Sequence, residues 1–92
     1  LLFNNNAYGN VRRIQQERFG EDRTIASTLQ NPDMSKLADA FGVKYWHADS
    51  PDSLRPALGA SIDHDGPCLV EVTVDAMPNP WPFLRLPRVR GN

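Results

Sequence analysis

The segment from Cys68 to Val74 constrains the fold most, because it is apolar at all but two positions, Glu71 and Thr73. Its length and its β-branched residues are typical of a strand. A strand that is apolar on both faces is normally covered on both, as are the central strands of parallel sheets. The segment therefore predicts a strand inside a parallel sheet.

Five further elements are predicted by apolar periodicity and by start and stop signals. Asn31 and Ser50 each precede a proline and an aspartate, which is the pattern of a helix cap followed by proline at the first helical position. Gly20 is expected to stop the first helix in a left-handed conformation, and Pro56 is expected to bend the last helix or delay its start. The order is strand, helix, helix, strand, helix, strand, over residues 1–3, 8–19, 31–41, 43–47, 50–65 and 68–74. Right-handed crossovers make this an α/β fold, a three-layer parallel sheet with helices on both faces.

Residues 76–92 differ in composition, since four prolines alternate there with aromatic residues and arginines. Such proline spacing favours an extended or polyproline conformation. We therefore expect residues 1–75 to form the folded part and residues 76–92 to form a proline-rich C-terminal tail.

The composition limits the possible functions. The net charge of -1 provides no basic surface for nucleic acid or for an anionic membrane. No apolar run approaches the roughly 20 residues that a membrane span needs. A single cysteine, Cys68, forms no internal disulfide, which favours a cytoplasmic protein and a packing role for this thiol.

The first strand changes abruptly from apolar residues into three asparagines, Asn4, Asn5 and Asn6, and Tyr8 and Gly9 follow at the start of a helix. Asparagines alone are typical of a turn or a cap. Open α/β sheets, however, bind ligands at the carboxyl ends of their strands. The start of a helix also presents free N–H groups and a positive dipole end to an anion.

This run resembles the second half of the thiamine-diphosphate-binding motif, which opens with Gly-Asp-Gly and closes with Asn-Asn. Further matching segments follow in the family's order: 31–33, 36–38, 40–42, 66–67 and 70–72. To about Trp81 the chain resembles the cofactor-diphosphate domain of acetolactate synthase-like enzymes, including relatives similar to benzoylformate decarboxylase. The Gly-Asp-Gly half would precede Leu1, so we expect this chain to be the C-terminal piece of a larger enzyme.

The resemblance implies specific site residues. The second asparagine of the family's pair binds Mg²⁺ through its amide oxygen, and the residue two positions later binds it through its backbone carbonyl. In this sequence these ligands are Asn5 and Ala7, and Tyr8 and Gly9 join them at the diphosphate of the cofactor. Asn4 is expected to brace the turn. The family's remaining ligand, an aspartate, belongs to the Gly-Asp-Gly half.

The resemblance also implies a function for the full-length protein. It would be a thiamine-diphosphate- and Mg²⁺-dependent lyase or transferase that decarboxylates a 2-keto acid and passes the remaining carbon unit to an acceptor. A homodimer or homotetramer is expected, with the activating glutamate in a separate domain, so the 92 residues alone should be inactive. Many acetolactate synthases carry a tryptophan where this chain has Ile14, which argues against synthesis of acetolactate, and the Pro-Trp tail favours decarboxylase and lyase relatives. The alternative is a non-catalytic, stand-alone α/β interaction module whose Pro-Trp-Pro tail binds a partner.

Other polar residues have simpler interpretations. His47 and His64 are isolated and lack metal-ligand spacing, which favours surface or strand-end roles. Glu71 either supports a functional site or, in the simpler interpretation, is an acid at a strand edge that pairs with an arginine. Arg12 and Arg13 either meet an anion or a partner subunit, or lie on a solvated helix face.

Overall fold

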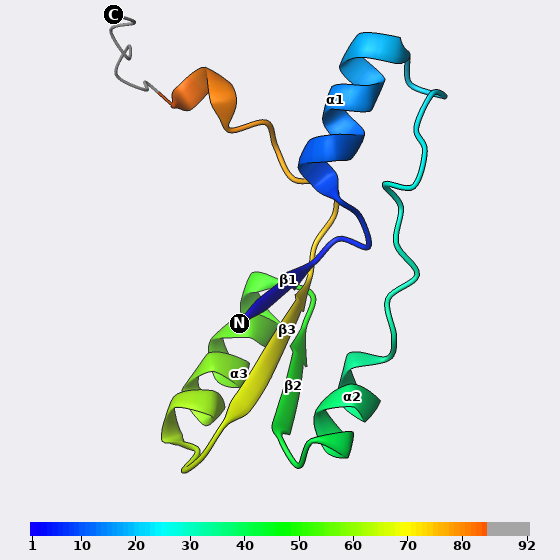
Figure 1. The fold of residues 1–92 in the computed structure, drawn as a ribbon. Coiled ribbons are helices and arrows are strands. Elements are labelled where there is room, and N and C mark those ends of the chain that lie inside the picture. The colour runs from blue at the N-terminus through cyan, green and yellow to red at the C-terminus, as the bar shows by residue number, and fades with distance from the viewer. Residues whose placement is uncertain (85–92) are drawn as a thin grey trace, which may run out of the picture.

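The computed structural model describes residues 1–84 (Figure 1). Its elements are β1 (Leu2–Asn4), α1 (Gly9–Phe19), α2 (Met34–Ala40), β2 (Lys44–Ala48), α3 (Pro51–Asp63), β3 (Cys68–Thr73) and the short 3₁₀ helix η1 (Trp81–Phe83). Their order confirms the predicted succession of strands and helices. Within the described residues, every helix is too short or too polar to cross a membrane.

The three strands form one parallel sheet in the order β1-β3-β2. The apolar segment from Cys68 onward is therefore the central strand, as predicted. Leu2 of β1 and His47 of β2 both align with Glu71 of β3. The strand ends at Thr73, one residue earlier than expected, although the Val74 N–H still donates to the Asn4 carbonyl at 3.0 Å.

The sheet has helices on both faces, which confirms the three-layer prediction. Val70 and Val72 are buried against Ala57 of α3. Because side chains alternate along a strand, Glu71 points to the opposite face, where its carboxylate meets Tyr45. Asp33, at the start of α2, is close enough to influence Tyr45 electrostatically. Figure 1 accordingly shows α2 and α3 on opposite sides of the strands.

The start of α2 differs from the prediction. Asp33, not Asn31, is the N-cap, and its carboxylate accepts hydrogen bonds from the backbone N–H groups of Ser35 and Lys36. The hydroxyl of Ser35 and these N–H groups lower the pKa of Asp33 below its usual value. The cap is therefore strongest above about pH 4 and weakens as the carboxylate is protonated at lower pH. The Asn31 side chain instead donates hydrogen bonds to Asn4 and Asn6 in the candidate site.

The start of α3 agrees with the sequence pattern. Ser50 and Ser53 form a reciprocal capping box, and Pro51 occupies the first helical turn. Pro56 lies inside the helix, which nevertheless begins at Pro51, so the predicted alternative of a delayed start is wrong.

Replacement of the α3 cap should be measurable. Ser50→Ala removes the acceptor of the Ser53 N–H, so we expect the free energy of unfolding to fall by about 1 kcal/mol. Urea denaturation of the full-length protein measures it. Ser61→Ala is the control, because the Ser61 hydroxyl only donates to the Leu58 carbonyl within the helix. Equal effects of the two substitutions would contradict a capping role.

Helix α1 projects away from the sheet (Figure 1). None of its residues is buried, and Val11 and Ile14 are exposed. The radius of gyration of 17.4 Å exceeds the roughly 12 Å expected for a compact chain of this length. Gly20 ends the helix with φ +107° and ψ 156°, so the stop signal is confirmed, but the conformation is not the predicted left-handed helical one.

The tail begins in irregular backbone and then forms η1. The predicted extended or polyproline conformation is therefore wrong for Trp81–Phe83, which make one turn of 3₁₀ helix. The remainder of the predicted tail, residues 85–92, lies outside the described residues.

Candidate functional site

The asparagine turn, residues Asn4 to Ala7, lies at the C-terminal end of β1 as predicted. The Asn4 side-chain oxygen accepts the Asn6 N–H at 3.0 Å, and the Asn5 side-chain oxygen accepts the Ala7 N–H at 3.2 Å. Asn6 has a φ of +52°, a left-handed conformation that asparagine tolerates better than most residues. Two successive side-chain-to-backbone hydrogen bonds therefore fix the path of the turn, and Asn4 braces it as expected.

The two predicted metal ligands keep oxygen lone pairs available. An amide oxygen has two lone pairs, and the Ala7 N–H is the one donor to Asn5 Oδ1 within residues 1–84. The Ala7 carbonyl accepts no hydrogen bond from the described part of the chain. An antiparallel bridge between Ala7 and Thr28 holds this residue in place. The turn thus presents one amide oxygen and one carbonyl oxygen, which are hard donors suited to Mg²⁺.

Tyr8 and Gly9 connect the turn to α1. The Tyr8 N–H donates to the Ser27 carbonyl at 2.8 Å, and the Tyr8 ring is exposed. A Cβ at Gly9 would lie 3.0 Å from Nδ2 of Asn5. The absence of a side chain at Gly9 therefore leaves room for the Asn5 side chain. Binding of the cofactor by Tyr8 and Gly9 remains a prediction.

Two clefts open beside the turn. The smaller, which we call the turn cleft, has a volume of about 220 Å³ and contains the guanidinium-bearing residues Arg12 and Arg13 of α1. Arg13 forms an ion pair with Glu17 at 2.8 Å, so Arg12 is the stronger candidate for an anion. The turn cleft is lined by Asn5, Ala7, Gly9, Arg12, Arg13, Gln16, Ala76 and Met77.

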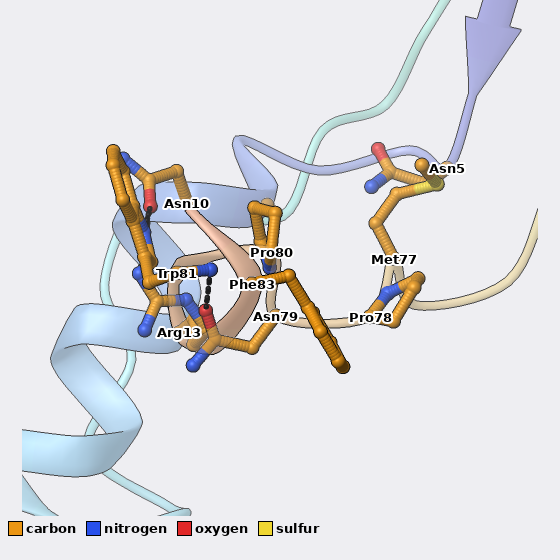
Figure 2. Close-up of a pocket in the computed structure, with 10 residues that line it drawn as sticks. Asn5, Asn10, Arg13, Met77, Pro78, Asn79, Pro80, Trp81 and Phe83 are labelled. Carbon is orange, nitrogen blue, oxygen red and sulfur yellow. Dashed lines mark hydrogen bonds between the residues drawn. The ribbon is translucent and has the colours of Figure 1, made fainter. Parts of the chain in front are cut away.

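The larger, which we call the tail cleft, has a volume of about 580 Å³ and lies between α1 and the segment leading to η1 (Figure 2). Asn5 and Gly9 line both clefts. The Trp81 indole N–H reaches toward the Asn10 side-chain oxygen at 3.5 Å, a long and weak contact. The tail cleft is lined by Asn5, Gly9, Asn10, Arg13, Met77, Pro78, Asn79, Pro80, Trp81 and Phe83.

Sequence reasoning missed the polar group beneath the turn. Glu71 is not at a strand edge beside an arginine, as interpreted above, but lies buried in the central strand. Its carboxylate accepts hydrogen bonds from Asn4 and Tyr45. Burial, reinforced by the hydrogen bond to Glu71, raises the pKa of Tyr45 to about 12, so its hydroxyl is a hydrogen-bond donor at neutral pH. A glutamate inside an apolar strand was the available signal.

The remaining candidates have the structural roles expected of them. The His47 ring lies 2.8 Å from the Thr73 hydroxyl on an exposed part of the sheet, and His64 stacks edge-on against Trp46. Cys68 makes a weak contact with the Ser61 carbonyl at 3.7 Å. Residues 1–84 contain no cluster of three histidine, cysteine or acidic side chains able to hold a metal.

The comparison with protein families is decisive at this point. Residues 1–72 match the model of the C-terminal TPP-binding domain of thiamine pyrophosphate enzymes, thiamine pyrophosphate (TPP) being another name for thiamine diphosphate. The chain belongs to this family. The resemblance inferred from the asparagine run and the matching segments that follow it is therefore confirmed.

The chain is also similar in sequence to individual proteins. The chain is 36% identical over 84 residues to the acetolactate synthase isozyme 2 large subunit of Escherichia coli, an alignment that covers 91% of the chain and 15% of that protein. It is 33% identical over 85 residues to the acetolactate synthase large subunit of Pyropia yezoensis, covering 91% and 14%. It is 37% identical over 79 residues to the 2-hydroxyacyl-CoA lyase of Arabidopsis thaliana, covering 82% and 14%.

Proposed function

We propose that this chain provides the Mg²⁺- and diphosphate-binding end of a thiamine-diphosphate-dependent enzyme that acts on 2-keto acids. One observation carries the proposal: the asparagine turn holds the Asn5 amide oxygen and the Ala7 carbonyl, which accepts no hydrogen bond within residues 1–84, at the edge of the turn cleft. Since the chain spans only about a seventh of the relatives named above, the activity belongs to a longer protein.

The residues of the turn fit a magnesium site of a particular kind. Mg²⁺ takes six oxygen ligands and usually shares them between protein and phosphate groups. Asn5 and Ala7 supply neutral oxygens, so the negative charge would come from the diphosphate and from the aspartate of the family's Gly-Asp-Gly motif. Arg12, lining the same cleft, and the N-terminus of α1 add positive potential for the phosphates.

The chemical step follows from the cofactor class. Thiamine diphosphate supplies the electron sink for breaking and forming carbon–carbon bonds, while the protein binds and orients it. We propose decarboxylation of a 2-keto acid followed by transfer to an acceptor, in a cytoplasmic homodimer or homotetramer. Relatives named as acetolactate synthase and 2-hydroxyacyl-CoA lyase support carbon–carbon bond chemistry. The family match favours this enzyme over the stand-alone interaction module.

Removal of one metal ligand tests the proposal. In the full-length protein, Asn5→Ala should weaken Mg²⁺ and thiamine diphosphate binding together by about 10- to 100-fold, judged from the cost of losing metal-supporting residues. The two affinities should fall in parallel because a Mg²⁺ ion held by Asn5 and Ala7 would supply positive charge for binding the diphosphate. Isothermal titration calorimetry of the cofactor, with Mg²⁺ or with a chelator, measures this coupling.

The neighbouring asparagine provides a matched control. Asn6→Gly removes an exposed carboxamide, with its 3.2 Å contact to Asn31, and preserves the backbone conformation with positive φ and the Asn6 N–H that Asn4 accepts. This variant should bind the cofactor with nearly unchanged affinity. Unchanged affinity in Asn5→Ala, or equal losses in both variants, would show that Asn5 is only a turn residue.

A further inference from the structure

The buried carboxylate of Glu71 has no role in the site as described so far. Glu71 is 8% exposed, on the central strand. It accepts a hydrogen bond at 2.6 Å from Asn4 Nδ2 and another from the Tyr45 hydroxyl. Burial of a carboxylate is costly unless hydrogen bonds compensate for the lost water. Here the compensating donors come from β1 on one side and β2 on the other.

The contact with Glu71 determines how the Asn4 amide is oriented. Glu71 Oε1 accepts from Asn4 Nδ2, so it faces the NH₂ end of the Asn4 side chain. The oxygen end must then point away from Glu71, and there it accepts the Asn6 N–H at 3.0 Å. Glu71 thereby fixes the orientation of the group that holds Asn6 in its left-handed conformation.

A second amide completes this arrangement. Asn31 Nδ2 donates to the side-chain oxygens of Asn4 at 2.8 Å and Asn6 at 3.2 Å. If the Asn4 amide were reversed, its NH₂ group would face two donors, the Asn31 NH₂ and the Asn6 N–H. Glu71, Asn6 and Asn31 therefore all favour the same orientation of the Asn4 amide, in which every partner of Asn4 is satisfied.

We propose that Glu71 is a positioning residue for the Mg²⁺–diphosphate site, acting through Asn4 on the turn that presents Asn5 and Ala7. The inference rests on the proposed function, since it assigns a role toward the same metal. Glu71 would act without contacting the metal, by holding the turn whose two oxygens would bind it. Octahedral Mg²⁺ tolerates little displacement of its ligands.

Three single variants of the full-length protein separate positioning from general stability. Glu71→Ala should lower the affinity for thiamine diphosphate in saturating Mg²⁺ by about 10-fold or more, as loss of a residue supporting a metal ligand does. Glu71→Gln, which can still accept from Asn4, should bind within about twofold of wild type. Tyr45→Phe should also stay within about twofold, because it removes the other hydrogen bond to the same carboxylate but leaves Asn4 held. Calorimetry gives the affinities, and thermal denaturation reports folding.

A double-mutant cycle with Asn5→Ala links the effect to the metal ligand. In the Asn5→Ala background the ligand is already lost, so Glu71→Ala should cost less than about twofold more. An undiminished loss in that background, an unchanged affinity in Glu71→Ala alone, or a Tyr45→Phe loss as large as that of Glu71→Ala would overturn the proposal. If Asn5→Ala alone changes nothing, the proposed function fails instead.

A second variant keeps the proposal testable if Glu71→Ala does not fold. Glu71→Leu in a Tyr45→Phe background removes the carboxylate and one polar partner while nearly preserving volume, a replacement that buried polar pairs often tolerate. It should fold and should show the same 10-fold loss relative to Tyr45→Phe. Wild-type affinity in this variant would refute a positioning role for Glu71.

Discussion

Gly9→Val should abolish measurable binding of thiamine diphosphate and Mg²⁺ by the full-length protein, a loss of more than about 100-fold. The physical reason is the short distance between this glycine and the proposed ligand. A Cβ alone would lie 3.0 Å from Asn5 Nδ2, tighter than most Cβ contacts, and valine adds two methyl groups. The Asn5 amide must then leave its position, and the methyl groups enter both clefts that Gly9 lines.

Gly59→Val is the matched control for this prediction. Gly59 also lies in a helix, but a Cβ there meets no atom within 4 Å. The control makes the same glycine-to-valine change in a helix, so its effect on helix propensity is similar. It should nevertheless bind the cofactor normally. Gly9→Ala should give an intermediate loss, since the amide has to move only by a few tenths of an ångström. Normal calorimetric affinity in Gly9→Val would show that the Asn5 side chain is not needed at its present position.

Much of the fold follows from local patterns in the sequence. The apolar segment beginning at Cys68 could only be a strand covered on both faces, and it is central with a helix layer on each side. The pattern Ser50-Pro51 predicts the start of α3 correctly because a capping box is a local structure. The same pattern fails at Asn31, because its side chain is already bound to Asn4 and Asn6. A tertiary contact thus overrides a local preference.

In the candidate site, too, local contacts could be predicted from the sequence and long-range contacts could not. The turn itself was predictable, since its hydrogen bonds join residues two positions apart. The contacts beneath it were not, because Glu71 is 67 positions from Asn4 and 26 from Tyr45 along the chain. No spacing rule connects residues so far apart before the strand order is known. Likewise, the apolar residues of α1 indicate which face should be covered, but not that α1 stands clear of the sheet.

The exposed apolar residues lead to the last prediction, which concerns the 92-residue chain produced alone. Phe41 is 77% exposed and Ile62 is 80% exposed, whereas soluble monomers rarely expose large apolar patches. The core is small, with Ala57, Val70 and Val72 as its buried cluster. Both outer strands, β1 and β2, also carry an edge that no described strand pairs, and free strand edges recruit other chains. We therefore expect the isolated chain to self-associate and to lack the activity of the full-length enzyme.

Light scattering coupled to size-exclusion chromatography, over a series of concentrations, should show a mass that rises from monomer to dimer and beyond. Phe3 is 55% exposed on the edge strand β1, so Phe3→Lys places a charge where an added strand would pair. This variant should remain monomeric to a higher concentration, whereas Arg18→Lys, a change on α1 far from the edge, should behave as wild type. If Phe3→Lys associates as strongly as wild type, the strand edge is not the site of association. A monomer with a sharp, cooperative melting transition at every concentration would contradict the prediction. It would show that the small core stabilises the isolated chain even with its apolar residues and strand edges exposed.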